Sequence, residues 1–231
     1  MCESCGNANK GLSRRELLGA VAAGVTLPLT RIAPAPAGAR EIEIICKWAW
    51  GGRAATGEFH RHTVRRLTVH HSGVRLTDNR DVPERLRNYQ RGHQAQGWPD
   101  IAYHLIVDRR GNIYKGRPFW ARGDTRTDYD PRGHLLVMCE GNFSQQRVSD
   151  RQVRALVAVL AWAARRFEVP IRTIRGHRFY AATECPGDDL NRRITGGAIR
   201  RRVRRSDRVT ARRLCGDAGR QRVRAIERGD A

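Results

Sequence analysis

The sequence predicts one α/β domain built around a mixed β-sheet, with additional segments at both ends of the chain. Three observations support this prediction. Short apolar runs typical of strands are interleaved with helical patterns, and two of the runs form a hairpin. The length of 231 residues is enough for one medium domain plus extra segments. The composition, with 40% apolar and 29% charged residues, excludes collagen-like, low-complexity and multi-span membrane chains.

Residues 1–39 are typical of an export signal. A basic start ends in Arg14-Arg15, the apolar stretch Leu17–Leu29 follows, and small residues at 37–39 fit a cleavage site. Paired arginines before a moderate apolar run resemble a twin-arginine signal. We therefore expect export through the Tat translocase, to a secreted, periplasmic or cell-wall location. A disordered basic tail or a buried amphipathic helix is the alternative.

The chain is strongly basic, and the formal net charge is +21. Of its 44 basic residues, 41 are arginine. Residues 1–39 hold four basic and two acidic side chains, so the remaining 192 residues carry +19. This balance predicts affinity for an anionic partner, which could be nucleic acid, a membrane surface or an acidic polymer.

The elements of the domain follow in order. We expect residues 40–63 to be an extended lead-in and residues 64–70 to be a short strand that ends at a turn. A helix is expected over residues 82–94, because Pro83 lies near its start.

Residues 103–107 form a second apolar run, and the turn at 110–112 leads into Ile113-Tyr114, so a hairpin is expected. The unbroken apolar run 135–139 is typical of a buried central strand.

The clearest helix covers residues 149–167, with Ser149 as its N-cap and Pro170 beyond its end. Apolar residues recur in it at three- and four-residue spacing: Val153, Leu156, Val157, Leu160, Ala161 and Ala164.

After residue 191 the composition changes. Residues 192–231 hold 14 arginines against four acidic residues. One interpretation is a pair of basic helices that pack on the domain, and the other is a docking surface for an anionic polymer. We therefore assign residues 40–191 to the domain and residues 192–231 to a basic, helical C-terminal extension.

Three positions carry side chains suited to metal chemistry: His70-His71, Tyr103-His104, and the pair His177 and Cys185. Each has a simpler explanation when taken alone. A histidine at a strand end is usually a hydrogen-bonded surface group, and an exported cysteine is usually in a disulfide. Together, two histidines and one cysteine supply three zinc ligands and leave one tetrahedral position open, as in catalytic zinc sites.

Five motifs in order resemble the peptidoglycan recognition protein and type 2 N-acetylmuramoyl-L-alanine amidase family. They lie at residues 69–72, 97–104, 109–117, 140–143 and 176–187. The resemblance covers about residues 42–192. It implies a single domain whose mixed central sheet is flanked by α-helices. It also implies zinc-dependent hydrolysis of the amide between N-acetylmuramic acid and L-alanine in peptidoglycan.

Carried over by position, the resemblance makes His70, His177 and Cys185 the ligands of Zn²⁺. Tyr103 matches a tyrosine that assists the metal-bound water or the oxyanion, and Thr183 matches a position that is Thr or Lys in active members. The cysteine ligand argues for catalysis, because members that only bind the wall often lack it. At position 179 the family usually has Asp, and this sequence has Phe179.

Four further residues are candidates for substrate binding. His71 is expected near the substrate and not on the metal. Trp98 either lines the groove or belongs to the core, and Asp124 either contacts substrate or serves a turn. Glu140 is a groove-lining residue, a general base or a salt-bridged group.

Cys2 and Cys5 belong to the expected export signal, so the cysteines that remain besides Cys185 are Cys46, Cys139 and Cys215. Cys139 lies in the expected buried strand and is interpreted as a free, inert thiol. A disulfide between Cys46 and Cys215, which flank the domain, is a hypothesis.

The expected partners are a peptidoglycan muropeptide as substrate and anionic cell-wall polymers at the arginine-rich tail. The alternative function is a peptidoglycan-binding protein without hydrolysis. A nucleic-acid binder is not expected, because the chain shows no such motif and carries an export signal.

Overall fold

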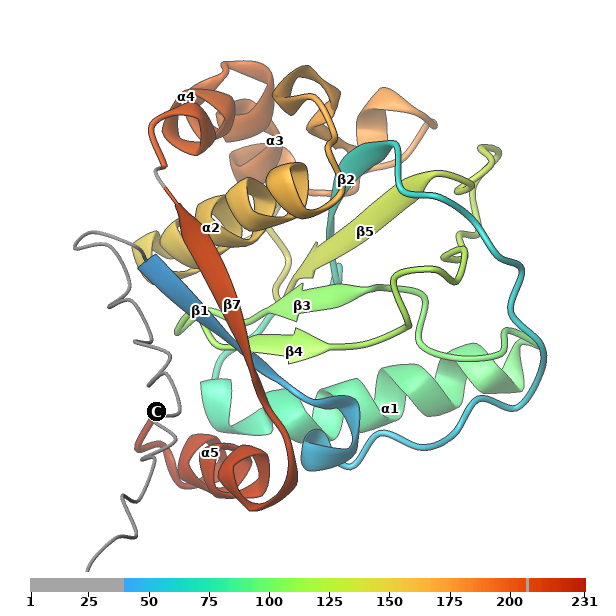
Figure 1. Ribbon diagram of the computed structural model, residues 1–231, viewed down its shortest axis with the longest axis vertical. Helices are drawn as coiled ribbons and strands as arrows, with labels where there is room; N and C mark the ends of the chain where they lie inside the picture. Colours follow the sequence, from blue (N-terminus) through green and yellow to red (C-terminus); the bar gives the residue numbers. More distant parts are fainter. Residues whose placement is uncertain (1–39, 207) are drawn as a thin grey trace, which may run out of the picture. The chain divides into compact units, whose positions relative to one another are not determined.

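Seven strands form one mixed sheet in the part of the chain that this computed structural model describes, residues 40–206 and 208–231. The export signal expected at residues 1–39 lies outside the described residues. The strand order is β6-β2-β5-β3-β4-β1-β7, and β3–β4 is antiparallel while the other pairs are parallel (Figure 1). The strands are β1 Arg40–Ile45, β2 Arg66–His71, β3 Leu105–Val107, β4 Ile113–Lys115, β5 His134–Cys139, β6 Arg175–Gly176 and β7 Val209–Leu214.

The predicted hairpin and the predicted central strand are both confirmed. Strands β3 and β4 pair around the turn at residues 110–112. Strand β5 is buried along its whole length, because β2 and β3 pair with it on either side. An unbroken apolar run suits a strand of this kind, which has no solvent-facing side.

The prediction that residues 40–63 form an extended lead-in is wrong for residues 40–45, because these form strand β1 of the sheet. Ile42, Ile44 and Ile45 of this strand are buried. Strand β1 pairs with β4 on one side and with β7 on the other. Both partners lie far along the chain, so the local pattern did not show that these residues would be paired.

Helices cover both faces of the sheet (Figure 1). Helices α2, α3 and α4 lie on one face, and α1 and α5 lie on the other. Ser149 caps α2 as predicted, since its side chain accepts a hydrogen bond from the Gln152 amide. None of the described helices has the length and apolar character needed to cross a membrane. The helices are α1 Val82–Ala95, α2 Asp150–Arg166, α3 Asp188–Thr195, α4 Ala198–Arg204 and α5 Gly216–Arg228.

Alternation along the strands divides the core into two layers. In β5, Val137 belongs to the layer under α2, and Met138 belongs to the layer over α1. In β2, Val69 likewise faces α2. Because neighbouring side chains on a strand point to opposite faces, His70 lies on the α1 side and His71 on the α2 side.

The basic C-terminal segment contains two helices, and it also contains the edge strand β7, which was not predicted. Strand β7 pairs with β1 over six residues. The apolar positions identified in this segment are all buried: Ile199, Val203, Val209, Leu214, Val223 and Ile226. The segment is therefore built into the sheet and both helical layers.

The structure contains the Cys46–Cys215 disulfide that was a hypothesis from the sequence. Cys46 follows β1 and Cys215 follows β7, and their Cα atoms are 4.9 Å apart. Cys139 is a fully buried free thiol in β5. The disulfide therefore joins the ends of two paired strands.

We expect the Cys46→Ser/Cys215→Ser variant to unfold with a free energy lower by about 3–5 kcal/mol, because the disulfide closes a very long loop in the unfolded chain. Urea denaturation measures this difference. A reducing agent should bring the wild type down to the level of the variant and leave the variant unchanged. Equal free energies of unfolding of the wild type and the variant, both measured without a reducing agent, would contradict the disulfide.

Candidate functional site

Pairing of β6 with β2 brings the two candidate histidines together. Val69 is in register with Gly176, so His70 and His177 each follow a paired residue on adjacent parallel strands. Their ring centroids are 4.5 Å apart. Both imidazoles are buried, with 3% and 6% exposure. The sheet therefore joins two residues that are far apart in the sequence.

Cys185 completes this cluster from the loop before α3. Its Sγ atom lies 3.6 Å from Nδ1 of His70 and accepts a hydrogen bond from the backbone N–H of His71 at 3.3 Å. One potential ligand atom from each of His70, His177 and Cys185 lies within 4.8 Å of the others. The predicted ligand set is thus assembled at the end of β2.

The donor set fits a zinc ion. Tetrahedral zinc with bonds of about 2.0–2.3 Å separates its ligands by roughly 3.3–3.8 Å. The Cys185 Sγ–His70 Nδ1 distance of 3.6 Å falls in this range, and all three ligand atoms lie within 4.8 Å of one another. The Nε2 atom of His70 is buried and has no hydrogen-bond partner among the described residues. His70 is therefore not a histidine satisfied by ordinary polar contacts.

Burial sets the protonation of these groups. It lowers the pKa of His70 well below its usual value, with the neighbouring His177 adding to the effect, and lowers the pKa of His177 to about 4. Both imidazoles are therefore neutral at pH 7, as metal ligands must be. Burial raises the pKa of the Cys185 thiol to about 12, so a metal that binds there has to displace the thiol proton.

Thr127 contacts the imidazole ring of His177. Its hydroxyl lies 2.7 Å from Nε2 of His177, which leaves Nδ1 of that ring for a metal. A second contact of this kind is typical of metal-binding histidines, because it fixes the ring orientation. Sequence reasoning missed Thr127, and the only signal was its position three residues after Asp124.

A cavity of about 330 Å³ opens onto this cluster. Of the predicted site residues, it is lined by His70, His71, Trp98, Tyr103, Asp124, His177, Thr183 and Cys185. Sequence analysis missed His93 and Arg126 among the lining residues. His93 comes from α1, and its ring centroid lies 4.9 Å from that of Trp98.

Tyr103 and Thr183 both reach the cavity beside the ligand cluster. The ring centroids of Tyr103 and His70 are 5.4 Å apart. Burial raises the pKa of the Tyr103 phenol, with the nearby Cys185 adding to the effect, so its hydroxyl stays protonated. The Thr183 hydroxyl accepts a hydrogen bond from the Cys185 amide at 3.2 Å. Both hydroxyls are therefore potential donors to a substrate oxygen.

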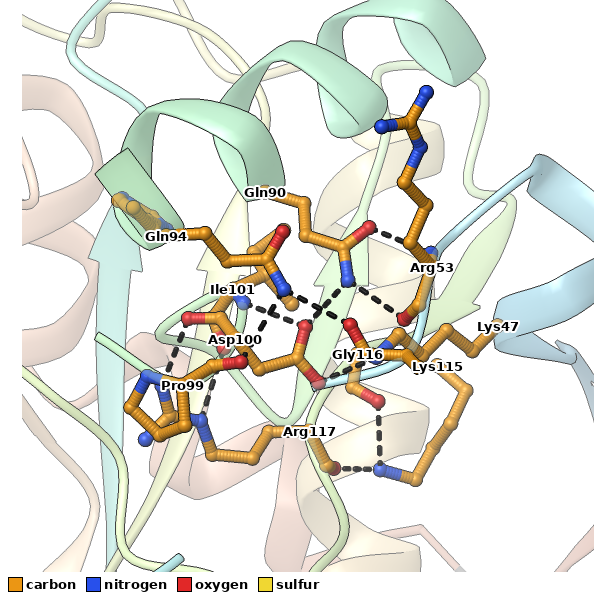
Figure 2. A network of polar contacts seen from close by, with 12 residues as sticks. Lys47, Arg53, Gln90, Gln94, Pro99, Asp100, Ile101, Lys115, Gly116 and Arg117 are labelled. Carbon is orange, nitrogen blue, oxygen red and sulfur yellow. Dashed lines mark hydrogen bonds and ion pairs between the residues drawn. The ribbon is translucent and has the colours of Figure 1, made fainter. Parts of the chain in front are cut away.

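A buried network around Asp100 holds the loop that carries Trp98 and Tyr103 (Figure 2). Asp100 has no exposed surface and forms an ion pair with Lys47. Its Oδ1 atom also accepts hydrogen bonds of 2.7 Å from Gln90 and from the Ile101 amide. The carboxylate thus ties the loop to α1 and to the segment after β1.

Arg117 links this loop to Asp124. The buried guanidinium donates to the carbonyl oxygens of Asp100 at 2.8 Å and Ile101 at 3.0 Å, and pairs with Asp124 at 2.6 Å. A Cβ atom at Gly116 would lie 2.2 Å from the Tyr103 carbonyl oxygen, so only glycine allows this close approach. Asp124 is therefore both ion-paired and part of the cavity wall.

His71 and Glu140 have different surroundings from the ligands. Nδ1 of His71 accepts a hydrogen bond from the Phe143 amide at 3.3 Å, on the opposite face of β2 from His70. Glu140 has no exposed surface and does not line the cavity. It pairs with Arg85 at 2.8 Å and accepts a hydrogen bond from Tyr89 at 3.0 Å, so the structure shows the salt-bridged alternative.

Comparison with known proteins identifies relatives over this region. The sequence profile of the N-acetylmuramoyl-L-alanine amidase family matches residues 60–188, which include all three candidate ligands. Peptidoglycan-recognition protein SC2 of Drosophila melanogaster is 29% identical over 153 residues, which cover 64% of this chain and 83% of that protein. The human N-acetylmuramoyl-L-alanine amidase is 30% identical over 182 residues, 76% of this chain but 31% of the relative.

Solved structures show the same fold. The ectodomain complex of peptidoglycan recognition proteins LCa and LCx bound to tracheal cytotoxin matches with a TM-score of 0.61 and 26% identity. That match covers 67% of this chain and 95% of the other. The amidase LysC from Clostridium intestinale matches with a TM-score of 0.51 and 22% identity, over 65% of this chain and 90% of that chain.

We expect Asp100→Ala to lower the free energy of unfolding by about 3–5 kcal/mol, because it leaves the Lys47 charge and two buried donors without their partner. Chemical denaturation measures the loss. The matched control is Asp128→Ala, because Asp128 is an exposed acid and its removal should change stability by less than about 0.5 kcal/mol. Equal effects of the two substitutions would show that the network does not hold the loop.

Glu140 should make stability depend on pH. Burial raises the pKa of its carboxyl to about 7, against a reference value of 4.5, so between these values the folded protein holds a proton that the unfolded chain has lost. Stability attributable to Glu140 therefore falls as pH rises from 5 to 8, by on the order of 2 kcal/mol.

The measurement is the unfolding free energy of the wild type and of Glu140→Gln at both pH values. The difference between the two proteins should change in favour of the variant at the higher pH. Stability curves that stay parallel between pH 5 and 8 would contradict the raised pKa.

Proposed function

Because this chain belongs to the N-acetylmuramoyl-L-alanine amidase family, we propose that it hydrolyses the amide between N-acetylmuramic acid and L-alanine in peptidoglycan with a bound zinc ion. The observation that carries the proposal is the complete set of His70, His177 and Cys185 at the wall of the cavity. These three side chains would hold a zinc ion, and a set of three protein ligands is typical of catalytic zinc sites, where water or substrate takes a further position. A protein that only binds peptidoglycan needs no such set of metal ligands.

Zinc, when bound, supplies Lewis acidity toward the scissile carbonyl and toward water. Residues of the chain itself orient the metal ligands and the substrate. Thr127 fixes the ring of His177, and the His71 amide holds the Cys185 sulfur in place. Tyr103 presents a protonated hydroxyl from the cavity wall and is positioned to stabilise the oxygen that becomes anionic as the amide is attacked. Thr183 is the second hydroxyl in this role.

The cavity wall beyond the ligands is suited to a peptide attached to a sugar. Trp98 provides an apolar face, and His71 and the ion-paired Asp124 provide polar contacts. We assign these three residues to substrate binding. Glu140 is not among them, since it is fully buried and does not line the cavity.

Two further proposals concern location and partners. We propose that residues 1–39 direct export through the Tat translocase, so that the protein reaches the periplasm, the cell wall or the medium. We also propose that the arginine-rich C-terminal segment holds the protein on anionic cell-wall polymers, which high salt would weaken. Nucleic acid is not part of this proposal.

The full chain should contain about one zinc ion per molecule and should release L-alanine amino ends from purified peptidoglycan. His70→Gln removes a ligand and should abolish both zinc content and hydrolysis. The matched control is His60→Gln, because His60 is exposed and lies outside the cavity, and this variant should retain both. Zinc is measured by atomic emission and amino ends by derivatisation.

The Tyr103→Phe variant separates the contribution of the tyrosine hydroxyl from that of zinc binding. It should keep zinc and lower the rate of hydrolysis by about 100-fold, as expected for loss of one donor to the oxyanion. A wild type that binds peptidoglycan without zinc or hydrolysis would establish the binding protein instead. Hydrolysis that persists in His70→Gln would show that the ligand assignment is wrong.

A further inference from the structure

A second cavity lies on the other side of the segment that carries His177. Its volume is about 420 Å³. Arg175 lines it from β6, Phe179 from the turn after β6, Asn191 and Thr195 from α3, and Arg200 from α4. We call it the arginine cavity. Strand β6 lies at one edge of the sheet, so this side of it is not covered by another of the described strands.

Two guanidinium groups converge in the arginine cavity. Nη1 of Arg175 and Nη1 of Arg200 both lie 3.3 Å from one acceptor, the carbonyl oxygen of Ile174. In the described part of the chain, neither guanidinium forms an ion pair with a carboxylate. Arg178, which also lines the cavity, is by contrast paired with Asp188 at 2.8 Å. Two neighbouring positive charges are thus left uncompensated.

More positive charge surrounds this pair. Desolvation lowers the pKa of Arg200, and repulsion from Arg175, Arg204 and Arg201 lowers it further. Like charges held this close disfavour one another. An anion bound between Arg175 and Arg200 would offset this repulsion.

The wall of the cavity also offers apolar surface. Phe179 is 65% exposed, which is unusual for a large hydrophobic residue, and the Arg175 guanidinium stacks on its ring at 4.9 Å. The exposed Phe179 ring therefore gives the cavity a surface on which a sugar ring can pack.

We propose that the arginine cavity binds a phosphate ester carried by a cell-wall glycan. Two guanidinium forks match the oxygens of a phosphate group, and an exposed aromatic ring matches the apolar face of a sugar. The inference rests on the proposed function and refines it, since it makes phosphate-bearing glycan strands the preferred substrate class.

The position of the cavity favours a glycan over other anions. Gly176 and Arg178 line the arginine cavity, while His177 between them lines the candidate active site. A glycan strand whose peptide lies in the active site would therefore pass close to the arginine cavity. A cavity of about 420 Å³ has room for one phosphate and one sugar, whereas nucleic acid binding needs a longer groove that follows the backbone.

The test measures binding of N-acetylglucosamine 6-phosphate to the full chain by isothermal titration calorimetry, with N-acetylglucosamine as the neutral probe. We expect the phosphorylated sugar to bind and the neutral sugar not to bind. Arg175→Gln/Arg200→Gln should weaken binding at least tenfold. The matched control is Arg202→Gln/Arg205→Gln, which removes the same charge from exposed positions at α4 outside the cavity and should stay within twofold of the wild type.

Thermal unfolding of each variant confirms that it is folded before binding is compared. Equal weakening in the two double variants would overturn the proposal, because it would mean that only net charge matters. Tighter binding of phosphatidylglycerol vesicles or of single-stranded DNA than of the sugar phosphate, lost in Arg175→Gln/Arg200→Gln, would also overturn it in favour of a membrane or a nucleic acid.

Measured rates of hydrolysis distinguish this inference from the proposed function. The wild type should cleave peptidoglycan that retains its phosphodiester-linked polymers faster than peptidoglycan stripped of them with hydrofluoric acid, and Arg175→Gln/Arg200→Gln should lose this preference. Cleavage of both substrates at equal rates would overturn the phosphate site and leave the amidase intact. Failure to cleave either substrate would overturn the proposed function, while the calorimetry would still decide the phosphate site.

Discussion

The site depends on the hydrogen bond between the His71 amide and the Cys185 sulfur. This contact joins the end of β2 to the loop before α3, which lies more than a hundred residues later in the chain. Together with the pairing of Val69 and Gly176, it fixes the positions of all three candidate ligands. His70 lies in β2, which is flanked by β5 and β6, and His177 begins the turn directly after β6. The sulfur adds the third ligand from the loop before α3.

The other wall of the active-site cavity is held by buried charge. Asp100 and Arg117 have almost no exposed surface, and Asp100 links the Trp98–Tyr103 loop to Lys47 (Figure 2). Arg117 links the same loop to Asp124. Buried charges of this kind are stable only when each has a partner with good geometry. The loop that carries Tyr103 is consequently fixed before substrate binds, which favours a preorganised site.

Sequence reasoning predicted the elements whose pattern is local and missed those whose partners are remote. The apolar period of α2 and the unbroken run of β5 were sufficient for correct predictions. Strand β1 was missed because its pairing with β4 and β7 depends on residues far along the chain. For the site, His70, His177 and Cys185 were chosen on ligand chemistry and family motifs, and the structure brings them together. Thr127 was not predicted, since its position three residues after Asp124 does not show that its hydroxyl contacts His177.

We propose that two histidines and one cysteine of this chain hold a zinc ion. X-ray absorption at the zinc edge of the purified protein tests it most directly. We predict one sulfur at about 2.3 Å and two imidazole nitrogens at about 2.0 Å, with one further light atom from solvent. A shell without sulfur, or one with two or more sulfur atoms, would contradict the ligand set and with it the proposed mechanism.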